Sequence, residues 1–308
     1  MLKNRYFLII FALSSLGCAS GNPTLSLTKV TENVYSAIGV TNAPSYENAG
    51  HNNNLSFIIT TDGVVVVNGG DNYLLAKALH ASILEVTQQP VKLVVNENGQ
   101  GHSFLGNSYW EQQGVPAIAH EAAVREIEEH GPAILQRMQA RNKDKADGTF
   151  VTTPAQSFDK RQEITMGETK IVLISFGEAH SPGDISVWLP QEEVIITGDI
   201  AFHERLLAIF PDTNVARWIE SFDVMAQLAP KKVIPGHGPP TDIATIRQYT
   251  QGYLKFLVAA VNKILEEDGD LGDAYAIDQS EYAHLNTFEE LAVKNAGRLF
   301  QTMELDFF

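Results

Sequence analysis

Apolar residues recur along the first half of the chain with two different spacings. Residues 30–38 and 55–67 have the composition of β-strands, and the turn sequence Thr61-Asp62-Gly63 predicts that they form a hairpin. Residues 72–86 place their apolar side chains on one face of a helix. The short, mostly apolar run at 91–95 is typical of a strand that is buried on both faces. The first half therefore predicts strands and helices in alternation.

The second half continues this alternation. Strands are predicted at residues 117–119, 171–176, 185–189, 194–197 and 232–234. Helices are predicted at residues 121–141, 215–228 and 243–267. The polar stretch 142–148 is expected to be a surface loop. Two halves, each with strands followed by helices, indicate an α/β fold in which two sheets pack together and helices cover the outside, and we interpret residues 21–308 as one domain.

The N-terminus has the pattern of an export signal. Within residues 1–20, the basic side chains of Lys3 and Arg5 precede an apolar run that is too short to span a bilayer comfortably and ends in small residues. The single cysteine, Cys18, follows Ser-Leu-Gly, which resembles a bacterial lipoprotein cleavage box. Either Cys18 carries a lipid anchor, or an ordinary secretory signal is cut near Ser20. Both alternatives predict an exported protein, periplasmic or membrane-anchored, without disulfides.

Charge and composition narrow the possible partners. The chain has 22 Lys and Arg against 37 Asp and Glu, a formal net charge of -15, which disfavours binding to nucleic acid or anionic lipid. We therefore expect a small-molecule ligand or substrate, and a monomer by default. With nine His and one Cys, any metal site must use imidazole, carboxylate and amide groups rather than thiolates.

Polar side chains gather in glycine-flanked segments that directly follow predicted strands. These segments are 96–103, 177–184, 197–199 and 235–239. An α/β scaffold usually presents its functional groups at such strand ends, and glycine lets the backbone turn sharply there. The candidate site residues in these segments are Asn98, Gln100, His102, His180, Asp199 and His237.

Six sequence features, taken in order, resemble the metallo-β-lactamase superfamily. They are TDGVVVVNGG, VKLVVNENGQGHSFLGNSYW, GEAHSPGD, IITGD, VIPGHGP and a helical C-terminus. The resemblance runs from about residue 30 to the end. It implies a metallo-β-lactamase-type αβ/βα four-layer sandwich and a zinc-dependent hydrolase.

The sequence departs from the family pattern in its principal motif. Family members carry His-x-His-x-Asp-His in the first loop, and here those positions are Asn98, Gln100, His102 and Ser103. The aspartate that usually ends the second strand of the family pattern is Asn68. Three other family ligand positions are unchanged: His180, Asp199 and His237.

The resemblance implies two metal pockets, which these changes affect differently. The first would be built from Asn98, Gln100 and His180, and we expect it to be weak or empty, because neutral amides bind transition metals poorly. One branch of the family likewise has asparagine at the first motif position and uses one zinc ion in the second pocket. Asn98 fits that branch, but Gln100 and His102 do not.

The second pocket keeps enough ligands for a catalytic zinc ion. His102, Asp199 and His237 would hold the ion, while Ser103 stands in place of a histidine. His180 is expected either to act as general base or to complete the metal shell. The leading hypothesis is therefore a single-zinc hydrolase that attacks an ester, amide or lactam carbonyl with activated water.

Two alternatives remain open at this point. A metal-free, non-catalytic binding module of the same fold would also lose motif residues in this way. A rearranged site could instead hold a different metal through Glu97, His51 or His203. For Glu97 itself, a solvent-exposed surface carboxylate is the simpler interpretation, and a replacement base is the other.

Overall fold

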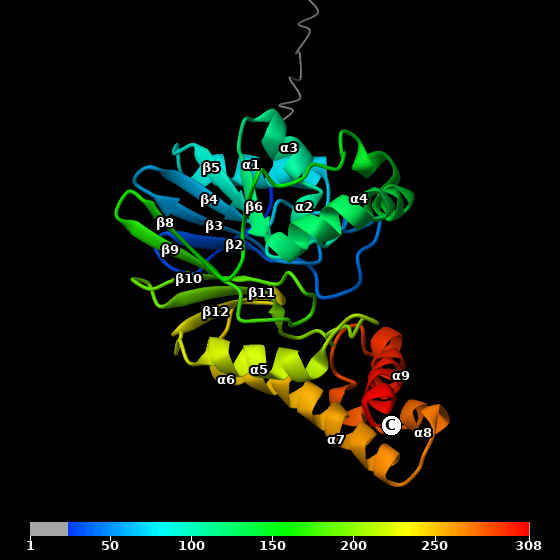
Figure 1. Cartoon of the computed structure of the whole chain (residues 1–308). Coiled ribbons are helices and arrows are strands. Elements are labelled where there is room, and N and C mark those ends of the chain that lie inside the picture. Colours follow the sequence, from blue (N-terminus) through cyan, green and yellow to red (C-terminus); the bar gives the residue numbers. More distant parts are fainter. Residues whose placement is uncertain (1–23, 308) are drawn as a thin grey trace, which may run out of the picture.

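The computed structural model describes residues 24–307 and shows two β-sheets packed face to face, with helices on both outer sides (Figure 1). This is the four-layer α/β sandwich that the sequence predicts. The predicted export signal at residues 1–20, including Cys18, lies outside the described residues. Among residues 24–307, none of the helices combines the length and the apolar character needed to cross a membrane.

The first sheet has seven strands in the order β1-β2-β3-β4-β5-β6-β7. Their bounds are β1 Leu27–Lys29, β2 Val34–Ala37, β3 Leu55–Thr60, β4 Gly63–Val67, β5 Val91–Val95, β6 Ala117–His120 and β7 Gln156–Phe158. Strands β1 to β4 pair antiparallel, and β4 to β7 pair parallel. The predicted turn at Thr61-Asp62 joins β3 to β4, and the predicted strand at 91–95 is β5.

Helices of the first half cover the outer face of this sheet (Figure 1). Their bounds are α1 Tyr73–Val86, α2 Gly101–Phe104, α3 Asn107–Gln112 and α4 Glu121–Asn142, and the short 3-10 turn η1 is Lys143–Ala146. Helix α1 begins after Asn72, whose side-chain oxygen accepts a hydrogen bond from Leu75 N at 2.8 Å and satisfies a free N–H group of the first turn. The helix therefore starts where the sequence predicts.

The second sheet has five strands in the order β12-β11-β10-β9-β8. Their bounds are β8 Arg161–Met166, β9 Thr169–Ile174, β10 Ser186–Leu189, β11 Val194–Phe202 and β12 Lys232–His237. All pairs are antiparallel except β11 with β12. The helical elements of this half are α5 Val215–Ala226, α6 Ile243–Ile246, the π-helical segment η2 Arg247–Gly252, α7 Tyr253–Glu266, α8 Leu271–Tyr275, the 3-10 turn η3 Ser280–Tyr282 and α9 Phe288–Phe307.

The inner faces of the two sheets form an aliphatic core. Val65 and Val95 from the first sheet belong to the same buried cluster as Leu173, Ile196 and Ile234 from the second. Burial of these side chains is the main favourable term that holds the sheets together. Polar contacts join the halves at one end, where Asn54 Nδ2 donates hydrogen bonds to Pro235 O at 2.8 Å and Gly238 O at 2.7 Å.

Strand β11 is longer than the sequence pattern predicts. The expected strand ended at Thr197, but the observed one continues to Phe202 and stays paired with β12. Gly198 has a φ angle of 58°, and the register shifts beside it, so an irregularity bends the strand without ending it. Asp199 consequently lies inside a buried strand rather than in the loop that the sequence indicated.

Replacing Leu173 by alanine tests the core between the sheets. Leu173 is fully buried there, and we expect Leu173→Ala to lower the free energy of unfolding by about 2–5 kcal/mol, because it removes apolar contacts and leaves a cavity. Leu84→Ala is the matched control, since Leu84 is 47% exposed on α1. Urea denaturation of both variants measures the difference, and equal losses would contradict the assignment of this core.

Candidate metal centre

The candidate site is assembled from both halves of the sandwich. Glu97 follows β5, and His102 lies on α2, while Asp199 lies within β11 and His237 ends β12. His180 comes from the loop between β9 and β10. A cavity of 220 Å³ is lined by side chains that include His102, His180, Asp199 and His237. The structure therefore brings together four residues that the sequence selected from separate segments.

Asp199 is the centre of this group. Its Oδ2 atom lies 3.5 Å from His102 Nε2 and 3.6 Å from His180 Nε2, and its Oδ1 atom lies 3.3 Å from His237 Nε2. Donor atoms about 2.0–2.2 Å from one zinc ion at tetrahedral angles are about 3.3–3.6 Å apart. The spacing between Asp199 and each imidazole is thus suited to a shared cation.

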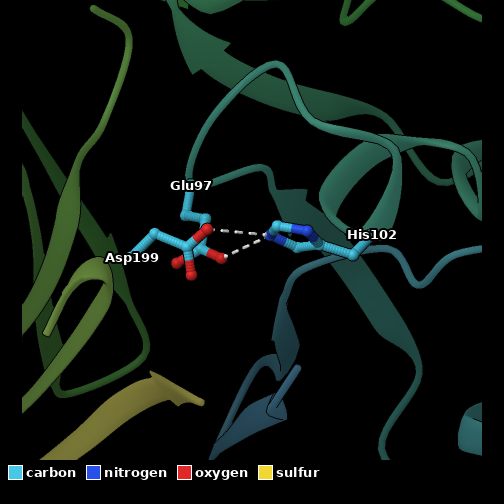
Figure 2. A group of neighbouring side chains, drawn as sticks. All are labelled: Glu97, His102 and Asp199. Carbon is cyan, nitrogen blue, oxygen red and sulfur yellow. Dashed lines mark hydrogen bonds and ion pairs between the residues drawn. The ribbon is translucent and has the colours of Figure 1, made fainter. Parts of the chain in front are cut away.

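Glu97 is a buried member of the same group, so its interpretation as a surface carboxylate was wrong. Its side chain turns toward β11, and its Oε1 atom lies 3.2 Å from His102 Nε2 (Figure 2). Ligand atoms of Glu97, His102 and Asp199 all lie within 4.8 Å of one another. His180 and His237 contact Asp199 from other directions and do not belong to that compact triad.

Burial and charge act in opposition within the triad. Burial, reinforced by the charge of Asp199, raises the pKa of Glu97 to about 6. Burial alone would lower the pKa of His102, but the charges of Asp199 and Glu97 outweigh it and raise the pKa to about 9. Asp199 shows the reverse balance, because the His102 and His237 imidazoles outweigh burial and lower its pKa. The two carboxylates therefore favour a cation beside them.

The orientation of His237 points to the same conclusion. Its Nδ1 atom is hydrogen-bonded to the carbonyl oxygen of Asn52, an acceptor, so Nδ1 carries the hydrogen. The Nε2 lone pair of the neutral ring then faces Asp199 Oδ1 at 3.3 Å, which is repulsive unless a proton or a metal ion lies between them. Burial lowers the pKa of His237 and disfavours the extra proton. A metal ion fits this contact better.

His180 lies among aromatic side chains. Its ring stacks on Phe210 at a centroid distance of 4.9 Å and also contacts Phe202 and Trp218. Burial in these surroundings lowers the pKa of His180 to about 4, so the imidazole is neutral near pH 7. A neutral imidazole is the form that can bind a metal or accept a proton.

Several buried polar atoms of the site have no hydrogen-bond partner within residues 24–307. They are Glu97 Oε2, Asp199 Oδ1 and His180 Nδ1. Unpaired buried atoms of this kind are rare in folded proteins, and they cost free energy unless water or an ion satisfies them. The two unpaired carboxylate oxygens, beside the imidazoles of His102 and His237, are donors suited to a divalent transition metal such as zinc. The residues present therefore fit the metal that the sequence predicts.

Asn98 and Gln100 hold different positions from the imidazoles. Asn98 Nδ2 donates to Asp184 Oδ1 at 3.2 Å and to Asp199 Oδ2 at 3.4 Å, while its Oδ1 accepts a hydrogen bond from Gln100 N. Asn98 thus presents N–H groups, not a ligand oxygen, to Asp199. The Gln100 side chain lines the cavity without contacting Asp199 through a hydrogen bond. Neither side chain presents a ligand oxygen to Asp199 through a hydrogen bond, and the expectation that the first pocket is weak or empty stays a prediction.

Other residues from the sequence analysis lie beside the centre. Ser103 Oγ donates to Asn68 Oδ1 at 2.8 Å, so the serine supports Asn68 rather than a metal. His51 Nε2 lies 3.4 Å from Ala37 O, and His203 Nδ1 lies 2.9 Å from Pro239 O. Neither histidine joins the Asp199 group, whereas Glu97 does.

Two glycines allow the carboxylates to approach the strands. A Cβ atom at Gly198 would collide with Glu97 Oε2, and one at Gly236 would collide with Asp199 Oδ1. Glycines flank all the candidate segments in the sequence, and Gly198 and Gly236 are two that the site requires.

Fold and site together define a two-sheet α/β sandwich with an imidazole and carboxylate centre at one end of its sheets. The sequence model of the Metallo-beta-lactamase superfamily matches residues 49–237, and the chain belongs to this superfamily. A type 2 metallo-beta-lactamase of Bacteroides fragilis is 18% identical over 226 residues, which cover 70% of this chain and 79% of that protein.

Solved structures show the same fold. A metallo-beta-lactamase from Pontibacter korlensis superposes with a TM-score of 0.60 at 19% identity, covering 75% of this chain and 99% of the other. The DIM-1 metallo-beta-lactamase exposed to ceftazidime superposes with a TM-score of 0.60 at 15% identity, covering 76% and 98%. These similarities support the predicted family and fold.

Exchanging the amide of Asn68 tests the buried position of Glu97. Asn68 Nδ2 donates to Glu97 Oε1 at 2.9 Å, and Asn68 has a φ angle of 69°, which aspartate also tolerates. In zinc-free protein at pH 8, we expect Asn68→Asp to lower the free energy of unfolding by about 1–3 kcal/mol, because two carboxylates then face each other. Urea denaturation measures the loss.

The double variant Asn68→Asp/Glu97→Gln provides the control. Its glutamine amide can donate to the new aspartate, so we expect it to recover most of the loss. Wild-type stability in Asn68→Asp, or no recovery in the double variant, would show that Glu97 and residue 68 do not interact.

Proposed function

We propose that this protein is a zinc-dependent hydrolase that acts on a small molecule with an ester, amide or lactam bond. The observation that carries the proposal is the convergence of His102, His180 and His237 on the buried carboxylate of Asp199, at spacings suited to a shared cation. Membership of the Metallo-beta-lactamase superfamily supports it.

Glu97, His102, Asp199 and His237 would hold the ion. Asp199 reaches His102 through one carboxylate oxygen and His237 through the other. The carbonyl oxygen of Asn52 fixes the ring of His237, and Asn68 fixes the carboxylate of Glu97. A bound zinc ion supplies Lewis acidity and lowers the pKa of a coordinated water molecule.

His180 is the proton-transfer group in this proposal. Its neutral ring lies in the cavity wall, packed against Phe210, and faces the carboxylate of Asp199 at 3.6 Å. That carboxylate stabilises the positive charge that forms when the imidazole accepts a proton. The aromatic packing holds the ring in place and limits the access of water.

The metal-free binding module explains the site less well. Without a cation, two neighbouring carboxylates and three imidazoles would remain buried together at a cost in desolvation and in unpaired polar atoms. The relatives are named as beta-lactamases, which makes a lactam one candidate substrate.

We also propose, from the pattern at residues 1–20, that the protein is exported, with Cys18 as a candidate lipid anchor.

Metal analysis of untagged, purified domain tests the proposed centre. We expect about one zinc ion per chain after zinc addition and dialysis, and loss of most of it in His237→Ala and Glu97→Gln. His130→Ala is the control, because His130 is exposed on α4, away from the site cavity. Mass spectrometry measures the metal, and no zinc in folded wild-type protein would refute the proposal.

Thermal unfolding of the same samples separates the hydrolase from the metal-free module. Zinc at about 100 times its dissociation constant adds about 2.7 kcal/mol to the stability of a protein that binds it only when folded. We expect EDTA to lower the melting temperature of wild-type protein and to leave that of His237→Ala nearly unchanged. A wild-type melting temperature that ignores EDTA would favour the module.

Replacing His180 by glutamine tests its role in proton transfer. We expect His180→Gln to keep its zinc but to lower the rate of hydrolysis of nitrocefin or 4-nitrophenyl acetate by about 100-fold or more. The amide resembles the imidazole in size and polarity but does not accept a proton near pH 7. Steady-state kinetics and metal content are measured together, and a parallel loss of zinc would assign His180 to the metal shell instead.

A further inference from the structure

A separate cavity lies among the C-terminal helical elements, apart from the candidate metal centre. It has a volume of 140 Å³, and its lining includes Tyr249 from η2, Glu281 and Tyr282 from η3, and His284. Among the described residues, none lines both this cavity and the one at Asp199. Pockets for drug-sized ligands have volumes of about 300–1,000 Å³, so this cavity suits a single small chemical group.

The π-helical segment η2 forms one wall of this cavity. Such segments occur frequently at functional sites. Thr250 Oγ1 pairs with both main-chain groups of Phe202, since it accepts from N at 2.9 Å and donates to O at 3.1 Å. These bonds attach η2 to the end of β11, and the neighbouring Tyr249 ring contacts the His203 ring at a centroid distance of 5.0 Å. Tyr249 is therefore held in place without a ligand.

The η3 turn supplies a second tyrosine to the wall. The ring of Tyr282 contacts the rings of Tyr253 and Phe256 at centroid distances of 4.9 and 5.3 Å. Tyr253 is buried, and its hydroxyl donates a hydrogen bond to Gln279 Oε1 at 2.9 Å. The ring of Tyr282 is thus supported from behind, which reduces the entropy that a ligand would have to remove on binding.

The carboxylate of Glu281 gives the cavity its charge. Within residues 24–307 it has no ion-pair partner, and no lysine or arginine lines the cavity. Arg247 and Lys255, which flank this part of the chain, pair with Asp223 instead. Burial, together with the charge of Glu281, raises the pKa of Tyr282, so the carboxylate lies near that ring.

These features favour an organic cation over other ligand classes. A carboxylate repels an anion, and a single carboxylate offers too few oxygens for a hard metal ion. Aromatic rings attract a cation that lies over their faces, and methylated ammonium groups are typical ligands of aromatic cages. The formal net charge of -15 also attracts cations to the protein.

We propose that this cavity binds a small organic cation, a methylated ammonium group, through Tyr249, Tyr282 and Glu281. The two rings provide cation–π contacts, and the carboxylate provides the opposite charge. This binding function is separate from the proposed hydrolase, because the cavity contains none of the residues of the metal centre.

Calorimetric titration of zinc-free protein with choline at pH 8 tests this assignment. The neutral comparison ligand is 3,3-dimethylbutan-1-ol, in which carbon replaces the nitrogen of choline and the shape is kept. We expect choline to bind wild-type protein about tenfold or more tightly than the alcohol. Glu281→Gln and Tyr249→Leu should each weaken choline binding by roughly fivefold or more, because the first removes the charge and the second an aromatic face.

Glu266→Gln is the matched control. Glu266 is exposed at the end of α7, about 21 Å along the helix axis from Gly252, and does not line the cavity. We expect this variant to bind choline like wild type, and thermal unfolding checks that each variant folds. Glu281 is exposed, so Glu281→Gln still decides the outcome if Tyr249→Leu does not fold.

Three results would each overturn the assignment of this cavity. They are no binding of choline to wild-type protein, equal binding of choline and the alcohol, and choline binding by Glu281→Gln that matches that of Glu266→Gln. Failure of the protein to take up zinc would refute the proposed hydrolase alone, because these titrations are made without the metal.

Discussion

The negative charge of Asp199 is held inside a buried strand, and the surroundings of the site are arranged around it. Water is excluded from this part of β11, so positive or hydrogen-bonding groups of the protein must stabilise the carboxylate. The His102 imidazole and the amide of Asn98 supply part of this stabilisation, while Asp199 Oδ1 has no hydrogen-bond partner among the described residues. The segments that follow β5 and β9, and the end of β12, must therefore all lie at one end of the sandwich.

The residues near the buried carboxylate of Asp199 differ from the family pattern, and the need to stabilise buried charge explains how they are arranged. Family members usually carry an aspartate where this chain has Asn68, and here the neighbouring carboxylate belongs to Glu97, which accepts a hydrogen bond from Asn68. The loop after β5 thus keeps an acidic group near the centre although its principal motif is altered. The Glu97 carboxylate and the Asn68 amide are 2.9 Å apart, so the acidic group lies directly beside residue 68.

Regular elements were predictable from the sequence, whereas the exact course of the site segments was not. The strand at 91–95 and the helix after Asn72 follow from local apolar spacing and capping, which depend only on neighbouring residues. The extension of β11 beyond Gly198 and the burial of Glu97 depend on contacts between the two sheets, which no local pattern contains. His102, His180, Asp199 and His237 were predicted together because each lies in a motif, and the structure places the three imidazoles within 3.6 Å of Asp199. Glu97 carries no motif, and it was therefore interpreted as a surface carboxylate.

The contacts between Asn54 and the end of β12 imply an order of assembly. Asn54 bonds to residues more than 180 positions away in the chain, and the site itself combines Glu97 with Asp199. Contacts this distant in sequence form slowly, because closing a long loop costs entropy before the contact contributes any favourable free energy. Each half can collapse on its own apolar residues first, but the complete set of donors exists only after the sheets have docked. The candidate metal centre is therefore completed late in the folding of this chain, and a nascent chain cannot assemble it until β12 has been made.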